Sequence, residues 1–220
     1  MIDRIIQYFA IFLALILVLP LHEFAHALIA VKCGDNTPKL AGRYTLNPLA
    51  HFDTMGLICF VLARFGWAKP VPVNPSNIKN YKWGSLFVAI AGVLANYLLA
   101  FLIYPLFILS LSVGDFGYFT DLLQYTLYFI FSLSLSFFAF NVLPIFPLDG
   151  FRIVEAFSKK RSKIYYYLRY YGPYILIFLM LLSVVAVFSG FYKLDILGTA
   201  IMFIVKYIRI PITAFWGLIL

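Results

Sequence analysis

The sequence predicts an all-α polytopic membrane protein with about five transmembrane helices and a re-entrant or extended membrane-associated segment. Two observations lead to this fold class. Of the 220 residues, 64% are hydrophobic and only 12% are charged, which excludes an ordinary soluble domain. Apolar stretches with few or no charges also recur along the chain, and about 20 apolar residues suffice for a helix to cross a bilayer.

The expected spans follow from these apolar stretches and from the turn residues that separate them. They are residues 5–31, 84–113, 122–148, 174–189 and 194–207. The last span is the least regular, because Lys206 and Arg209 shorten it and Pro211 follows. Residues 55–65 are apolar but too few for a full span, which favours a re-entrant or interfacial piece. The proline-rich residues 69–75 then favour extended chain.

The charged residues indicate how the chain sits in a membrane. The net charge of +8 comes from 17 Lys and Arg against 9 Asp and Glu, and the positive charges fall mainly between the apolar stretches. We interpret them as orientation signals and as contacts with anionic lipids, and we expect no nucleic acid partner. The densest basic stretch, residues 152–169, predicts a solvated anchoring face. We expect a multi-pass protein of the cell (inner or cytoplasmic) membrane, with this basic stretch on the cytoplasmic side and the N-terminus outside.

The first span carries the sequence His-Glu-Phe-Ala-His at residues 22–26, a pattern typical of zinc hydrolases. His22 and His26 are four residues apart, so they lie on one face of a helix and can bind one metal ion. Glu23 lies beside them and is expected to act as a base. It is the only formally charged residue within residues 5–31, and ionisable groups inside a membrane helix are usually functional. The alternative is a polar cluster satisfied by neighbouring helices.

A second polar motif ends the third long apolar stretch. Pro144 and Pro147 break the helix, and irregular backbone at membrane depth is tolerated only where it lines a cavity or is buried in protein. Asp149 follows the break and is the candidate third ligand, because catalytic zinc usually takes three protein ligands. The alternative is that Asp149 caps a short helix over residues 150–157. Asn141 is a candidate catalytic residue that hydrogen-bonds a substrate carbonyl.

Two more polar residues are candidates for contacts around the metal or with substrate. His51 is either a polar neighbour of the metal, a substrate contact, or a loop histidine near the membrane surface. Asn96 ends a stretch of small residues, 91–96, that permits helices to approach closely. Its side chain either faces the site or links neighbouring helices through a hydrogen bond.

Together these motifs resemble the site-2 protease family of intramembrane metalloproteases. The matching residues are 22–26, Asn141 and the Leu-Asp-Gly at 148–150. Residues 42–53 and 66–74 resemble stretches of the compact prokaryotic branch of that family. This branch lacks PDZ and CBS domains, and neither kind of domain is expected here.

The resemblance implies an activity and a set of roles. His22, His26 and Asp149 would bind Zn²⁺, and Glu23 would activate water. The chain would then be a zinc-dependent endopeptidase of the membrane, with the lipid bilayer and a membrane-protein substrate as its partners. The active site would lie near the cytoplasmic face.

We expect a single integral membrane metalloprotease domain over residues 1–220. Its catalytic core would cover about residues 1–155 and its C-terminal helices about residues 156–220. Two other functions stay open: a membrane transporter or ion pathway, and a catalytically silent relative that binds membrane proteins. The paired inverted repeats that favour transport are not seen in the sequence. Glu23 is present, which argues against a silent relative. The sequence predicts no oligomeric state.

Overall fold

The computed structural model describes residues 2–56, 68–157 and 162–220. Five helices among these residues are long and apolar enough to cross a membrane. They are α1 (Ile2–Lys32), α4 (Tyr81–Ser110), α5 (Tyr118–Asn141), α7 (Lys163–Ser189) and α8 (Ile196–Gly217). The described residues form no strand beyond an isolated bridge between Phe52 and Ala68. The predicted all-α fold of a polytopic membrane protein is therefore confirmed.

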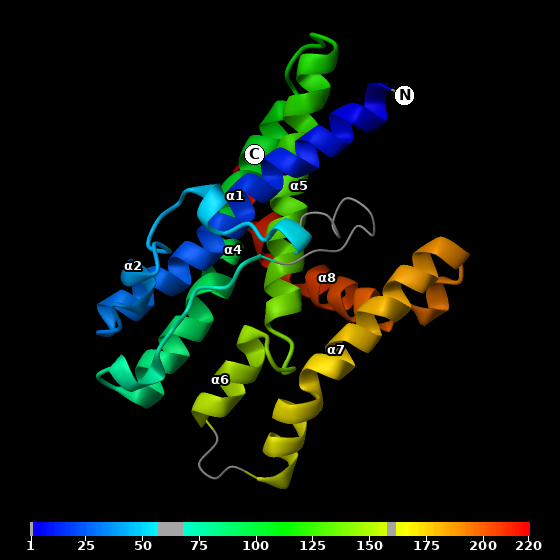
Figure 1. The fold of residues 1–220 in the computed structure, drawn as a ribbon. Coiled ribbons are helices and arrows are strands. Elements are labelled where there is room, and N and C mark those ends of the chain that lie inside the picture. The colour runs from blue at the N-terminus through cyan, green and yellow to red at the C-terminus, as the bar shows by residue number, and fades with distance from the viewer. Residues whose placement is uncertain (1, 57–67, 158–161) are drawn as a thin grey trace.

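Helices α1, α4 and α5 pack against one another, with α4 antiparallel to the other two (Figure 1). Ala14 and Val18 of α1 pack on Ile130 of α5, so small and branched side chains hold these helices close. Ala100 of α4 packs on Ile212 of α8, which covers another side of the bundle. Helix α7 packs on α8 and on η3 (Tyr192–Leu194) and leans away from the bundle in Figure 1.

Helix α5 ends at Asn141 rather than near residue 148, because turns occupy the proline-containing residues 142–148. The short helix α6 (Asp149–Phe157) follows and packs on α4. The turn back is close at Gly150, where an added Cβ atom would lie 2.1 Å from the carbonyl oxygen of Val142. Glycine at this position lets α6 begin directly beneath the end of α5.

The described part of the chain between α1 and α4 forms a folded connection, and none of its helices is long enough to span a membrane. It contains α2 (Thr37–Leu40), η1 (Pro48–Ala50), an irregular segment over residues 68–74 and η2 (Pro75–Asn77). The backbone N–H of Lys69 donates to the carbonyl oxygen of His51 at 2.8 Å, which joins the segment to the preceding loop. Most of the expected re-entrant piece, residues 55–65, lies outside the described residues.

The last two spans differ from the expected ranges. Helix α7 begins at Lys163 rather than near residue 174, because the hydroxyl of Ser162 accepts from the N–H of Tyr165 and caps the helix there. Helix α8 continues through Pro211 to Gly217 instead of ending near residue 207. One missing N–H is tolerated inside a membrane helix when neighbouring groups satisfy the freed carbonyl.

Candidate metal centre

Helix α1 presents His22 and His26 on the face that it turns toward α4. Their spacing puts both rings on one side of the helix, and their Nε2 atoms lie 3.0 Å apart. Both side chains are more than nine-tenths buried. The predicted pair therefore points into the protein and not toward lipid.

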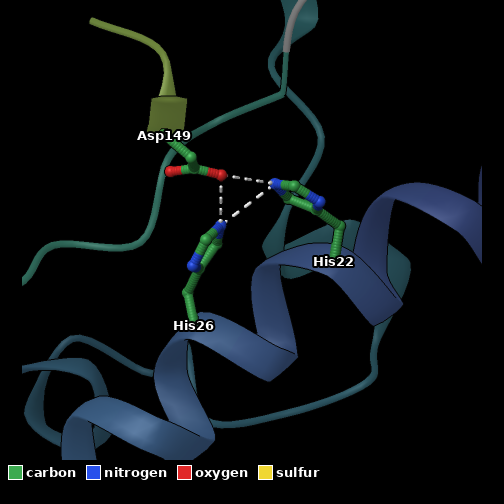
Figure 2. Close-up of side chains that lie close together, drawn as sticks. All are labelled: His22, His26 and Asp149. Atoms are coloured by element: carbon green, nitrogen blue, oxygen red, sulfur yellow. Dashed lines mark hydrogen bonds and ion pairs between the residues drawn. The ribbon is translucent and has the colours of Figure 1, made fainter. Parts of the chain in front are cut away.

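Asp149, the first residue of α6, faces the two imidazoles (Figure 2). Its Oδ2 atom lies 3.0 Å from Nε2 of His26 and 3.4 Å from Nε2 of His22. The three buried residues form a group that could hold a metal ion. The break after α5 thus brings a carboxylate to the histidines from a distant part of the chain.

Hydrogen bonds on the far side of each ring indicate which nitrogen faces the carboxylate as a lone pair. Nδ1 of His26 donates to the carbonyl oxygen of Val88 in α4 at 2.6 Å, so Nε2 of the neutral ring carries no proton. Nδ1 of His22 lies 3.1 Å from the side-chain nitrogen of Asn96. Oδ1 of Asn96 has no partner among the described residues, and half a turn of the amide lets it accept from Nδ1–H of His22.

Two imidazole lone pairs and a carboxylate oxygen thus converge in a buried place. This arrangement is unfavourable unless a cation or a proton lies between them. Tetrahedral Zn²⁺ with bonds of about 2.0–2.2 Å separates its ligand atoms by about 3.3 Å. The observed separations of 3.0 to 3.4 Å agree with that value. The three residues therefore fit zinc by donor type and by spacing.

Helix α4 can approach the histidines because residue 92 is glycine. A Cβ atom at this position would lie 2.3 Å from Nε2 of His26 and 2.7 Å from Cε1 of His22. The stretch of small residues around Gly92 therefore does more than bring two helices together. It leaves the space that the imidazole rings occupy.

Glu23 lies beside the three residues without joining their group. Its Oε2 atom accepts a hydrogen bond of 3.0 Å from the backbone N–H of Val71, in the segment over residues 68–74. Glu23 is partly exposed, whereas the three residues of the group are buried. Its carboxylate is therefore held next to the candidate metal centre without being enclosed by the protein.

Comparison with known proteins gives two matches. The model of a family described as peptidase family M50 matches residues 117–184, which include Asp149 and the break before it. A protein of Bacillus subtilis (strain 168) named "Putative zinc metalloprotease YwhC" is 42% identical over 146 residues. The alignment covers 65% of this chain and 66% of that protein. The chain belongs to the M50 peptidase family. None of the solved structures matches it.

The side chains of His51 and Asn141, two further candidates in this M50 chain, form hydrogen bonds within their own segments. His51 is fully buried, and its Nε2 atom contacts the carbonyl oxygen of Thr45 at 2.7 Å. Nδ2 of Asn141 donates to the carbonyl oxygen of Phe137, one turn earlier in α5, at 3.1 Å. Their roles toward metal or substrate stay predictions.

Asp35, which the sequence analysis did not single out, ties the segment over residues 68–74 to the end of α1. Its carboxylate is fully buried. Oδ2 accepts from the backbone N–H of Asn74 at 2.7 Å, and Oδ1 accepts from Nδ2 of Asn77 at 3.1 Å and from the N–H of Thr37 at 3.0 Å. The Asp35 carboxylate therefore anchors the segment over residues 68–74, which contacts Glu23, the candidate base of this M50 chain.

The charge of Asp35 predicts how stability depends on pH. Burial raises the pKa of this carboxyl, but hydrogen bonds from Thr37, Asn77 and Asn74 outweigh burial and bring the pKa below its ordinary value of 3.8. A carboxyl with a lowered pKa stabilises the fold above the ordinary pKa. This stabilisation is lost as the pH falls through the pKa of the folded state.

We expect Asp35→Asn to lower the free energy of unfolding by about 2 kcal/mol at pH 7, because charged hydrogen bonds are replaced by neutral ones. The difference from wild type should shrink below about pH 4. The free energies of unfolding of both proteins, measured in detergent micelles at pH 7 and in acid, give this difference. A difference that stays the same at both pH values would contradict a stabilising role for the charge.

Proposed function

We propose that the chain is an intramembrane zinc metalloprotease that hydrolyses peptide bonds of membrane-spanning substrates. The observation that carries this proposal is the convergence of His22, His26 and Asp149 beside the separately held carboxylate of Glu23. Membership of a peptidase family and a relative named as a zinc metalloprotease support it. We further propose that residues 1–220 form a single domain, with a catalytic core of about residues 1–155.

Each polar residue has a role in this mechanism. Zn²⁺ bound by the three residues would polarise a peptide carbonyl and lower the pKa of a water molecule. Glu23 takes a proton from the attacking water and delivers it to the leaving amine. The N–H of Val71 keeps the Glu23 carboxylate oriented. The amide of Asn141, turned away from Phe137, donates to the substrate carbonyl oxygen.

The place of the candidate metal centre in the bundle indicates the side of the membrane at which a substrate would be cut. The candidate metal centre lies in the second half of α1, beside the first half of α4 and just beyond the end of α5. Basic residues of α6 and α7 (Arg152, Lys163 and Arg169) follow at the same end. The excess of basic residues makes this end the cytoplasmic one in our proposal. A helical substrate must unwind before hydrolysis, because its carbonyl groups are hydrogen-bonded within the helix.

Cleavage by purified protein tests the proposal. In lipid vesicles, the full chain should cut a membrane-embedded peptide, a zinc chelator should stop the reaction, and added Zn²⁺ should restore it. Mass spectrometry identifies the new peptide ends. Ion flux without new ends would support a transporter, and binding without new ends would support a silent relative. Either result would contradict a protease.

A further inference from the structure

A pocket of about 270 Å³ lies at the end of the bundle where α4 begins, between α4, α6, α7 and the residues around η2. Apolar side chains form much of its wall. Arg152 of α6, Arg169 of α7 and Ser85 of α4 contribute polar groups. Pockets for drug-sized ligands usually measure about 300–1,000 Å³, so this pocket suits a single side chain or a small head group.

One positive charge in the pocket has no partner among the described residues. Glu155, also in the wall, accepts from Nη1 of Arg169 at 3.1 Å and from the hydroxyl of Tyr165. Arg152 forms no hydrogen bond or ion pair with the residues that the structure describes. Oγ of Ser85 is buried and likewise has no hydrogen-bond partner in the described part of the chain. The pocket therefore offers the Arg152 guanidinium to one negatively charged group.

Two of the elements around the pocket also reach Asp149 or Glu23. Arg152 follows Asp149 in α6 by about one helical turn, so the carboxylate facing the histidines and the guanidinium in the pocket come from one short helix. Val73 lines the pocket and belongs to the segment whose backbone contacts Glu23. One short segment of chain therefore contacts both Glu23 and the pocket.

Helix α4 gives the distance between the two places. Val88 lines the pocket, and its carbonyl oxygen accepts from Nδ1 of His26. Ser85 precedes Gly92, the residue next to the His26 ring, by about two turns of helix, which is about 10 Å. An extended peptide covers this distance with about three residues.

We propose that this pocket binds an acidic side chain of the substrate, about three residues from the bond that is cut. The inference rests on the proposed function and adds a substrate preference to it. A substrate carboxylate would take two hydrogen bonds from the Arg152 guanidinium. Partial burial between apolar walls strengthens such a pair relative to one in water. A lipid phosphate has similar chemistry, but the hydrogen bond between Val88 of the pocket wall and His26 favours the peptide as the source of the charge.

A set of membrane-embedded peptides tests this preference. Each peptide carries a single Glu, moved by one residue from peptide to peptide, and each has a partner with Gln at the same position. We expect one position at which Glu improves kcat/KM by about tenfold over Gln, in line with a charged hydrogen bond. Arg152→Gln should remove this preference, and Arg152→Glu should reverse it in favour of a peptide with Lys. Lys163→Gln is the matched control, because Lys163 is a basic residue of α7 that does not line the pocket.

Binding provides a readout that does not require cleavage. In protein that also carries Glu23→Gln, the Kd for the same peptides should show the same preference and the same dependence on Arg152. A Glu preference in Kd without cleavage in wild type would contradict the proposed function and support the pocket. Equal Kd for Glu and Gln at every position would overturn the pocket. The pocket's role in substrate binding would also be overturned if Arg152→Gln changed Kd only after phosphatidylglycerol is added to phosphatidylcholine vesicles. That result would assign the site to lipid.

Discussion

Glu23→Gln is expected to keep zinc and to reduce peptide cleavage by about three orders of magnitude, the middle of the range for general acid–base catalysis. Glutamine keeps the size of the side chain, and its oxygen can still accept from the N–H of Val71. It cannot take a proton from water. Because His22, His26 and Asp149 are unchanged, the metal content should stay close to wild type. Elemental analysis of purified protein and cleavage of a membrane-embedded peptide measure the two effects.

Asp149→Ala is the matched comparison, because it removes the carboxylate that faces both histidines. Zinc content and cleavage should then fall together, and His22→Ala and His26→Ala should behave in the same way. Normal cleavage by Glu23→Gln would contradict the hydrolase mechanism and favour transport. Full zinc content in Asp149→Ala would mean that the third ligand is elsewhere, and His51 would be the first residue to examine.

The spans and the histidine pair could be predicted because both depend on local sequence. Apolar length alone indicates a membrane helix. A spacing of four residues fixes the relative position of His22 and His26 as soon as the helix forms. Asp149 was harder to assign, because its approach to the histidines depends on how α6 folds back after the break. Helix ends were the least predictable: α5 stops at Asn141 because the turns before Asp149 already replace the helix.

Other parts of the site could not be predicted from the types of residue in the sequence. The N–H of Val71 and the carbonyl of Val88 are backbone groups, and every residue except proline carries both. Asp35 precedes Thr37 in a common turn pattern, but its bond to Asn74 depends on the tertiary fold. Arg152 belongs to a basic stretch that predicts a solvated face, whereas the structure has this side chain in the wall of a pocket.

Gly92→Ala is expected to lower zinc affinity at least tenfold, a loss of the size seen when the surroundings of metal ligands are disturbed. The new methyl group would lie 2.3 Å from Nε2 of His26 and 2.7 Å from Cε1 of His22. Neither ring can retreat freely. His26 is held by the carbonyl of Val88, and His22 is held by Asn96. Either the rings leave the position in which they face Asp149, or α4 moves away from α1.

Stability and zinc affinity should respond differently to this substitution. Overpacking costs about 1–3 kcal/mol, but alanine is favoured over glycine inside a helix by about 1 kcal/mol, so the loss of stability is partly offset. No such gain offsets the displacement of two ligands. Gly217→Ala is the control, because an added Cβ atom at that position of α8 meets nothing within 4 Å. Competition with a chromophoric chelator measures zinc affinity, and thermal unfolding measures stability. If Gly92→Ala binds zinc as tightly as wild type, the imidazoles do not bind the metal in the space that Gly92 leaves open, and the arrangement proposed for the centre is wrong.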